Sequence, residues 1–347
     1  MNNSILVTGA AGFIGFHLCK KLLNEGFNVV GIDNINDYYD SNLKFSRLKN
    51  LGISYEKAKI FLNKSSSTIY FNQFQFIRID INDKLKLSEF FVEHEFDIVC
   101  NMAAQAGVRY SLENPETYKL SNLSGFLNIL ECCRNNKIKK LVYASSSSVY
   151  GNNTKVPYHE SDNVDQPISL YAVTKKSNEL MAHSYSHLFQ IETIGLRFFT
   201  VYGPYGRPDM AIFLFTDSII NNKSINVFNN GNLLRDFTYI DDAIDGVYKV
   251  LTTKSLNKKM YKIYNIGNNK TIKLLDFIKV IEDNLGIKAN KKFLKNQPGD
   301  VHQTWADITE INKDFGYSPK TLIDDGVKKF ITWYKEYYLN KKNEQKI

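Results

Sequence analysis

Cysteine is scarce in this sequence and is not arranged to hold a metal ion. The 347 residues include four cysteines, Cys19, Cys100, Cys132 and Cys133. Their spacing matches no metal-ligand pattern, and the adjacent pair cannot easily form a disulfide with itself. Each cysteine lies in a pattern typical of a buried strand or helix. We therefore expect reduced thiols, as in the cytoplasm, and no metal site.

Long hydrophobic segments are missing as well. No stretch of about 18 apolar residues occurs, which a membrane-spanning helix would need. The amino terminus lacks the basic, apolar and cleavage regions of a secretion signal. The composition, 43% hydrophobic and 23% charged, is that of a soluble globular protein. We expect a cytoplasmic protein that is neither exported nor embedded in a membrane.

Positive charge is in excess, but it is not arranged to bind nucleic acid. The formal net charge is +8. Much of the lysine is scattered or lies in the charged tail at residues 341–347, and no basic stripe alternates with aromatic residues. We expect no nucleic acid partner, whereas a small anionic substrate is compatible with the charge.

A glycine-rich turn opens the chain. Residues 4–8 have the pattern of a short strand, Gly9, Gly12 and Gly15 follow, and a helical pattern begins directly afterwards. Glycines allow a tight turn and let the backbone approach a pyrophosphate, while the start of a helix favours negative charge. Because this turn lies between a strand and a helix, it predicts a dinucleotide site.

An acidic residue ends the next predicted strand, residues 27–32. A carboxylate at Asp33 would bind both ribose hydroxyls of an adenosine and repel a 2′-phosphate, so NAD is favoured over NADP. The alternative interpretation of Asp33 is a turn residue at a strand end. Asn34 and Asn36 are expected to add hydrogen bonds to the same ribose.

Two further strands are predicted, at residues 74–79 and 96–102. The first is followed by Asp80 and Ile81, which are suited to hold an adenine through one polar and one apolar contact. The second is followed by small residues, 103–107, where a cofactor would pass. Repeated strand and helix patterns predict a doubly wound parallel sheet, whose ligands bind at the carboxyl ends of the strands.

Two helical segments in this half differ in what we expect of them. Residues 115–135 have helical periodicity with Asn122 inside. An asparagine is disfavoured within a helix, so Asn122 either holds the backbone near the site or faces solvent. Residues 41–64 are rich in lysine with helical spacing, and we expect a solvated excursion without chemistry.

A hydroxyl-bearing strand and a tyrosine–lysine pair are the candidate catalytic groups. Residues 141–151 have the pattern of a buried strand that ends in serines. Tyr171 and Lys175 lie one helical turn apart and therefore share a face. A phenol with a pKa near 10 needs roughly 4 kcal/mol of bias to act as a base at neutral pH, and a nearby ammonium favours the phenolate. Of these serines, Ser146 is the one that we expect to relay the proton. Taken alone, the pair would be an ordinary helix contact and the serines a turn.

Taken in order, these motifs resemble the extended short-chain dehydrogenase/reductase superfamily, and its nucleotide-sugar branch in particular. The resemblance covers residues 5 to about 307. The matching segments are Thr8–Gly15, Asp33, Asp80-Ile81, Ser146, Tyr171–Lys175, Leu196–Pro204 and Arg235–Asp242. Within the branch, Met102–Ser111 and Gly206–Ala211 are similar to UDP-glucuronate 4-epimerases of capsule and cell-wall sugar pathways.

The resemblance implies bound NAD, a UDP-sugar substrate and a homodimer joined through the helices that follow residues 115 and 170. The catalytic residues it implies are Ser146, Tyr171 and Lys175. The residues implied to bind NAD are Gly9, Gly12, Phe13, Ile14, Gly15, Asp33, Asn34, Asn36, Asp80, Ile81, Ala103, Ala104, Gln105, Asn122, Tyr171 and Lys175. The residues implied to bind the UDP-sugar are Arg109, Ser147, Ser148, Thr200, Arg207, Phe228, Arg235 and Asp300.

Three substrate residues carry a physical argument or an alternative. A guanidinium such as that of Arg207 can grip a carboxylate through two parallel hydrogen bonds, and the alternative is a surface ion pair beside a proline turn. Phe228 either flanks the uracil or is a core aromatic residue. Arg235 is implied to meet the phosphates. Many relatives have arginine where this chain has Gln297, so no phosphate role is assigned there.

Members of the branch share oxidation at carbon 4 and differ in the next step. Similar dehydratases have an Asp-Glu pair at the positions of Ser147 and Ser148, because expelling a hydroxyl needs an acid and a base, and similar decarboxylases have glutamate in place of Ser148. Serines at both positions favour epimerisation at carbon 4. The resemblance implies that the reaction converts UDP-glucuronate to UDP-galacturonate, for surface polysaccharide synthesis. As a hypothesis, Arg207 and Thr200 hold the carboxylate so that carbon dioxide is not lost.

Several alternatives stay open at this point. The hydrogen on carbon 5 of a 4-keto uronate is acidic, so a UDP-glucuronate 5-epimerase is the nearest rival. A 4-epimerase of a neutral or N-acetylated UDP-hexose is another possibility. A non-catalytic NAD-binding scaffold is a different class, since a fold does not determine a function. Such relatives typically lose the tyrosine or the lysine, and this chain retains Tyr171 and Lys175.

The remaining residues are expected to form a smaller α/β lobe that closes over the substrate. A helix at 212–220, strands at 224–228 and 261–266, and a helix that Thr271 caps and Gly286 ends are predicted. A last helix lies around residues 327–339. Because single cores stop growing at roughly 250 to 300 residues, we expect two lobes. Residues 1–197 and roughly 238–266 would form the NAD-binding domain, and residues 198–237 and 267–340 would form the UDP-sugar lobe.

Overall fold

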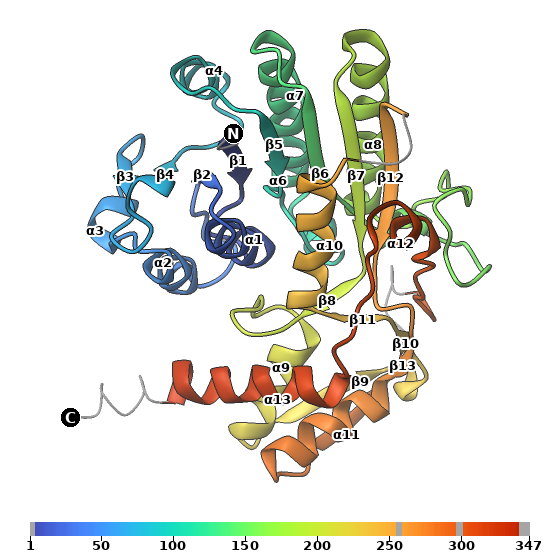
Figure 1. Ribbon diagram of the computed structural model, residues 1–347. Helices are drawn as coiled ribbons and strands as arrows, with labels where there is room; N and C mark the ends of the chain where they lie inside the picture. The colour runs from blue at the N-terminus through green and yellow to red at the C-terminus, as the bar shows by residue number, and fades with distance from the viewer. Residues whose placement is uncertain (1–3, 255–258, 296–300, 340–347) are drawn as a thin grey trace.

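The computed structural model describes residues 4–254, 259–295 and 301–339. An eight-stranded sheet lies between helices, and a smaller group of strands and helices lies below it in Figure 1. Its strand order is β12-β7-β6-β5-β1-β2-β4-β3. In chain order the strands are β1 (Ser4–Thr8), β2 (Asn28–Asp33), β3 (Lys64–Ser66), β4 (Phe74–Arg78), β5 (Ile98–Asn101), β6 (Lys140–Ser146), β7 (Glu192–Phe198) and β12 (Tyr261–Ile266).

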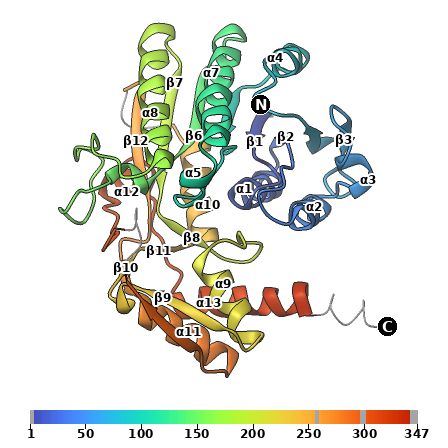
Figure 2. The same cartoon turned by 180° about the vertical axis from the view of Figure 1, so that it is seen from behind.

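The sheet has two buried faces because consecutive apolar residues of its strands point to opposite sides. In β1, Ile5 and Val7 face one core, whereas Leu6 faces the other. Both faces must therefore be covered by helices. The first core includes α1 (Phe13–Asn24), α2 (Ser41–Asn50) and α10 (Ile240–Thr252). The second includes α4 (Lys84–Glu93), α7 (Gly125–Asn135) and α8 (Leu170–Phe189), of which α7 and α8 face the viewer in Figure 2.

The predicted doubly wound parallel sheet is confirmed. Seven of the eight strands pair in parallel, and β3 is the exception because it runs antiparallel to β4 at one edge. The predicted strands agree with β1, β2, β4, β5 and β12 to within two residues at each end. Continuous apolar runs identified these strands well because both of their faces are buried.

The helical spacing predicted for residues 41–64 is confirmed in α2, but the prediction of a solvated excursion was wrong. This segment forms α2, the short helix α3 (Tyr55–Ala58) and β3. Lys44 and Arg47 are buried on the same side of α2 as Leu43 and Leu48. The Arg47 guanidinium donates hydrogen bonds to backbone oxygens of Ala11 and Tyr205, which replace its hydration. These partners are distant in the sequence, so they could not be predicted from it. The high lysine content of the segment therefore pointed to solvent exposure instead.

The predicted helix at 115–135 contains a change of helix type. It begins as α6 (Pro115–Tyr118), continues as the π-helical segment η2 (Lys119–Ser124) and ends as α7. Segments of π-helix are often found at functional sites. Asn122 lies in this wide turn and its side chain is buried.

The smaller lobe is built from three short strand pairs and three α-helices among the described residues. The strand pairs are β8 (Thr200–Tyr202) with β11 (Phe237–Tyr239), β9 (Ser224–Phe228) with β14 (Asn290–Leu294), and β10 (Leu234–Arg235) with β13 (Ile272–Lys273). The helices are α9 (Ala211–Ile220), α11 (Leu274–Leu285) and α13 (Ile323–Tyr334), whereas α12 (Thr309–Phe315) packs on α10 and β12 of the large sheet. Gly286 ends α11 with a φ of 70°, but Lys273 rather than Thr271 occupies the N-cap, so that predicted cap was wrong.

All four cysteines are buried and free. In the described part of the chain, no cluster of three histidine, cysteine, aspartate or glutamate side chains is placed to hold a metal ion. The helices of residues 4–254, 259–295 and 301–339 include none that is long and apolar enough to cross a membrane.

Candidate active site

A cavity of about 1080 Å³ lies at the carboxyl ends of the strands. Gly9 follows β1, Asp33 ends β2, Asp80 follows β4, and Ser146 ends β6. The smaller lobe closes the other side of the cavity with residues that include Phe228. Parallel strands end at one edge of the sheet, so this topology brings residues from separate sequence segments together.

The structure places nearly every predicted site residue on this cavity. The predicted residues that line it are Gly9, Gly12, Phe13, Ile14, Gly15, Asp33, Asn34, Asn36, Asp80, Ile81, Ala103, Ala104, Gln105, Arg109, Ser146, Ser147, Ser148, Tyr171, Lys175, Thr200, Arg207, Phe228 and Arg235. Asn122 lies behind the wall instead. Asp300 lies outside the described residues.

The glycine-rich turn leaves no room for side chains. A Cβ built on Gly9 would lie 2.8 Å from the Ala103 nitrogen, and one on Gly15 would lie 2.0 Å from the Gly9 oxygen. Gly9 also has a φ of 69°, a conformation that glycine adopts without strain. The turn is therefore packed tightly against neighbouring backbone, and it lines the cavity at the start of α1. This shape fits a pyrophosphate, as the dinucleotide prediction requires.

Asp33 is fixed by the backbone on both sides of the turn. Its Oδ2 accepts a hydrogen bond from Ala11 N at 3.1 Å, and its Oδ1 accepts one from Ile35 N at 2.7 Å. These contacts are what a strand-end turn residue would make, but the carboxylate also lines the cavity, where it can meet a ribose. Asn34 donates a hydrogen bond to Asp80 Oδ2 at 2.9 Å, so the segments after β2 and β4 are joined.

Lys44 is a site residue that the sequence argument missed. Its ammonium donates hydrogen bonds to the backbone and side-chain oxygens of Asn36, at 2.8 and 2.5 Å, and the residue lines the cavity. It thereby fixes the segment that follows Asp33. Helical spacing could have identified it, because positions 43, 44, 47 and 48 lie on one face of α2, and that face is buried.

Ser146, Tyr171 and Lys175 are brought together where β6 ends and α8 begins. Ser169 caps α8 by accepting a hydrogen bond from Ala172 N at 3.2 Å. Tyr171 and Lys175 therefore lie in the first two turns, as predicted, and both line the cavity. Lys175 is buried, and its ammonium donates a hydrogen bond to the Ala144 oxygen at 2.8 Å.

The electrostatics of this cluster differ from the simple picture of a lysine beside a phenol. Burial raises the pKa of Tyr171, while a hydrogen bond with Ser146 and the positive charge of Arg207 act to lower it. Burial lowers the pKa of Lys175 to about 7. Ser146 and Arg207 are thus the groups that favour the phenolate in this structure, and the predicted contribution of Lys175 to that step stays a prediction.

Asn122 supports the cavity wall from behind. Its Oδ1 accepts a hydrogen bond from Gln105 N at 2.8 Å, and its Nδ2 donates to the Gln105 oxygen at 2.9 Å and to Thr174 Oγ1 at 3.0 Å. The side chain is buried, so the solvent-facing interpretation was wrong. Asn122 instead joins the segment after β5 to α8, the helix that carries Tyr171.

The substrate half of the cavity contains three arginines. The Arg109 guanidinium lies 5.0 Å from the centroid of the Phe228 ring, and Phe228 is half-buried against the core while it lines the cavity. Arg235 donates a hydrogen bond to the backbone oxygen of Leu234 at 3.0 Å. Arg207 is paired with Asp209, with Nε 3.0 Å from Oδ1. Arg207 therefore forms the ion pair of the alternative interpretation and also lines the cavity.

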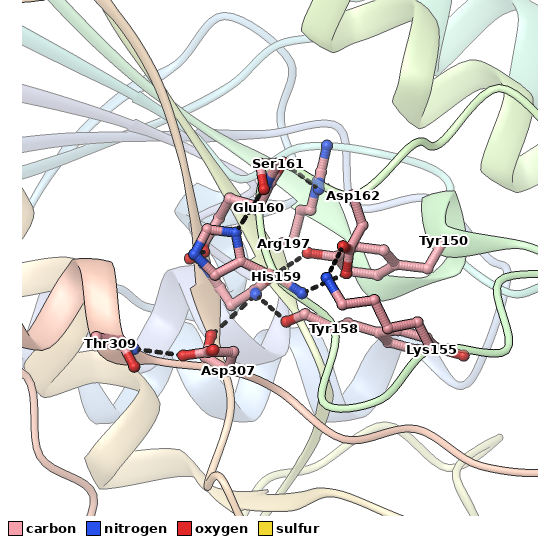
Figure 3. Close-up of polar contacts among 11 residues, drawn as sticks. Tyr150, Lys155, Tyr158, His159, Glu160, Ser161, Asp162, Arg197, Asp307 and Thr309 are labelled. Atoms are coloured by element: carbon pink, nitrogen blue, oxygen red, sulfur yellow. Dashed lines mark hydrogen bonds and ion pairs between the residues drawn. The ribbon is translucent and has the colours of Figure 1, made fainter.

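The loop between β6 and α8 is anchored by the polar contacts drawn in Figure 3. Lys155 pairs with Asp162 at 2.7 Å, and Asp307 N donates a hydrogen bond to the Tyr158 oxygen at 2.9 Å. The Arg197 guanidinium lies 4.8 Å from the centroid of the Tyr150 ring. Tyr158 lines the cavity as well, so these contacts join the smaller lobe to the loop that leads into α8.

Comparison with known proteins agrees with this geometry. The family model of the NAD dependent epimerase/dehydratase family matches residues 5–267. Protein CapI of Staphylococcus aureus is 49% identical over 348 residues, which cover 96% of this chain and 99% of that protein. UDP-glucuronate 4-epimerase 2 of Arabidopsis thaliana is 44% identical over 349 residues, which cover 96% of this chain and 76% of that protein.

Solved structures show the same fold. The crystal structure of UDP-glucuronic acid 4-epimerase from Bacillus cereus, in complex with UDP-glucuronic acid and NAD, has a TM-score of 0.85 and 37% sequence identity and covers 96% of this chain and 100% of that chain. The family model spans the glycine-rich turn, Asp33 and the Ser146–Tyr171–Lys175 cluster. On this evidence, the chain belongs to the NAD dependent epimerase/dehydratase family.

Proposed function

We propose that this protein is an NAD-dependent UDP-glucuronate 4-epimerase that interconverts UDP-glucuronate and UDP-galacturonate. The observation that carries the proposal is that Tyr171, Ser146 and Arg207 line the same cavity as the turn from Gly9 to Gly15. The similarity to UDP-glucuronate 4-epimerases of plants and of Bacillus cereus supports the choice of substrate.

The cofactor fits the residues that are present. The turn from Gly9 to Gly15 lines the cavity at the start of α1, where the helix N-terminus would favour a pyrophosphate, and the Asp33 carboxylate would hold the adenosine ribose. Bound NAD would accept a hydride from carbon 4 of the sugar and later return it to that carbon. The chain itself must orient the sugar and move the proton of the hydroxyl group on carbon 4.

Tyr171 is the residue that takes this proton. Its hydrogen bond with Ser146 and the charge of Arg207 stabilise the phenolate against the effect of burial. Positions 147 and 148 are serines, so no further acid or base stands ready to expel a hydroxyl group. We expect the 4-keto sugar to rotate in the site and regain the hydride on its other face. This outcome is epimerisation at carbon 4.

One incubation tests this proposal. Purified protein is incubated with UDP-glucuronate in deuterated water. The nucleotide sugars are separated by anion-exchange chromatography, and their masses are measured by mass spectrometry. UDP-galacturonate without solvent deuterium is expected, because the hydride on carbon 4 never exchanges. Solvent deuterium in the product would favour the carbon 5 route, and an absence of any product would contradict the proposal.

We also propose that the protein forms a homodimer through the surface of α6, η2, α7 and α8. Exposed apolar residues on these helices support this, since such residues gather at association surfaces. They are Leu120, Leu127, Val173, Leu180 and Leu188. Light scattering after size-exclusion chromatography should give a dimer for the natural protein and a monomer for Leu180→Glu, and a natural monomer would contradict the proposal.

The remaining predictions concern the organisation and the setting of the protein. The proposed division places the NAD site on the large sheet and the UDP-sugar site between that sheet and the smaller lobe, and the positions of Asp33 and Phe228 on one cavity support it. Four free, buried cysteines support a place in the cytoplasm. A role in surface polysaccharide synthesis stays a prediction.

A further inference from the structure

Arg207 does not meet the cavity as a free cation. Its guanidinium is gripped by Asp209, two residues further along the same loop, with Nε 3.0 Å from Oδ1 and Nη2 2.5 Å from Oδ2. This arrangement is the bidentate pairing in which guanidinium and carboxylate fix each other's plane. It occupies the Nε and Nη2 edge, whereas Nη1 makes no hydrogen bond to the described residues, and Arg207 lines the cavity.

Tyr38 holds Asp209 from the other side of the cavity. Its hydroxyl donates a hydrogen bond to Asp209 Oδ2 at 3.0 Å. The phenol lies close to Gly107, where a Cβ would come within 2.8 Å of the hydroxyl oxygen, and its ring centroid lies 4.7 Å from that of Tyr110. Three segments therefore converge on one carboxylate: the segment after β2, the segment after β5 and the loop that carries Arg207.

The protonation states suit these contacts at neutral pH. Burial raises the pKa of Asp209, but the charge and hydrogen bonds of Arg207 outweigh it, so the carboxyl group has a lowered pKa and stays ionised. Burial and the nearby Asp209 charge raise the pKa of Tyr38 to about 12, so the phenol stays a donor. Both bonds are therefore present at neutral pH.

We propose that Asp209 and Tyr38 are positioning residues that fix the plane of the Arg207 guanidinium, so that its free edge holds the sugar carboxylate out of alignment for loss of carbon dioxide. This inference rests on the proposed function. In the competing step the bond between carbon 5 and carbon 6 breaks, its electron pair moves toward the carbon 4 ketone, carbon dioxide leaves and carbon 5 takes up a proton. That bond breaks readily only when it lies parallel to the π orbitals of the ketone.

The experiment compares Asp209→Asn and Tyr38→Phe with the natural protein. Asp209→Asn keeps the size but presents an amide donor to the guanidinium, so the bidentate pair is lost. Tyr38→Phe removes one hydrogen bond and leaves the pair. Asp283→Asn is the matched control, because Asp283 is an exposed acid whose carboxylate lies 3.7 Å from Lys288 on the surface.

The readouts are kcat, KM for UDP-glucuronate, and carbon dioxide released per UDP-galacturonate formed. For Asp209→Asn we expect the carbon dioxide ratio to rise about tenfold and kcat to fall, while KM does not increase, because the guanidinium keeps its charge but loses its orientation. For Tyr38→Phe we expect the same direction with about a threefold rise in the ratio. The control should match the natural protein.

Two results would overturn the inference: a carbon dioxide ratio unchanged in both variants, or a raised KM with unchanged kcat, which is the pattern of lost binding alone. Thermal unfolding with and without NAD shows whether each variant is folded and binds cofactor, and Tyr38→Phe is the milder change if Asp209→Asn is unstable. If the natural protein forms no UDP-galacturonate, the proposed function has failed; if it does and the variants behave like it, only this inference has failed.

Discussion

Replacement of Lys175 tests the electrostatics of the active site without any substrate. Burial lowers the pKa of Lys175 to about 7, whereas a lysine in an unfolded chain has a pKa near 10.4. Between these values the unfolded chain binds nearly one proton more than the folded protein. The free energy of unfolding must therefore rise with pH in this window, and protonation of the folded protein removes the dependence below about pH 7.

The magnitude follows from the linkage relation, which assigns about 1.4 kcal/mol per pH unit to each proton. From pH 7 to pH 9 the difference in bound protons grows from about one half to nearly one. Lys175 should therefore add about 2 kcal/mol to the free energy of unfolding across this interval. In Lys175→Met this contribution is absent, while the other titrating groups contribute equally to both proteins.

The assay is urea unfolding of both proteins at pH 7, 8 and 9, after removal of bound nucleotide. The natural protein should gain about 2 kcal/mol relative to Lys175→Met between pH 7 and pH 9. Lys49→Met is the control, because Lys49 is exposed on α2, and it should follow the natural protein at each pH. Parallel curves for the natural protein and Lys175→Met would refute the claim that the site holds a desolvated lysine.

Other predictions address the base, the cofactor and the cavity wall. Tyr171→Phe should lower kcat by about 10²- to 10⁴-fold while NAD stays bound; full activity in a stopped-flow or chromatographic assay would contradict the role of Tyr171. Asp33→Asn removes the charge that repels a 2′-phosphate, so the ratio of NAD to NADP affinity should fall by about tenfold in fluorescence titrations; an unchanged ratio would assign Asp33 to the turn alone. Asn122→Ala leaves both backbone groups of Gln105 without that partner, and urea unfolding should show a loss of about 2–4 kcal/mol; a loss below about 0.5 kcal/mol would mean that water replaces the amide.

Much of the fold and of the cofactor site could be predicted from local sequence patterns. Strands such as β1 and β6 are apolar on both faces, and each leads directly into a residue of the site, Gly9 or Ser146. Tyr171 and Lys175 are related by one helical turn, which is a property of α-helix geometry. In a parallel sheet the carboxyl ends of the strands coincide, so these residues had to converge once the strands were identified.

Other features depended on partners that are far apart in the sequence. Arg47 is buried because carbonyl oxygens of Ala11 and Tyr205 replace its hydration. The residues next to Arg47 in the chain do not predict these two partners. In the same way, Tyr38 reaches Asp209 across 171 positions. Such contacts form only when loops from different strands meet over the sheet.

The sequence by itself therefore determined most strands of the large sheet, the glycine turn, the acidic strand end and the catalytic helix turn, because each depends on neighbours within a few positions. The tertiary structure decided which charges are buried, how the pKa of Lys175 is lowered and which edge of Arg207 is free. The physical reason is that desolvation and ion pairing depend on three-dimensional surroundings, which only the assembled loops provide.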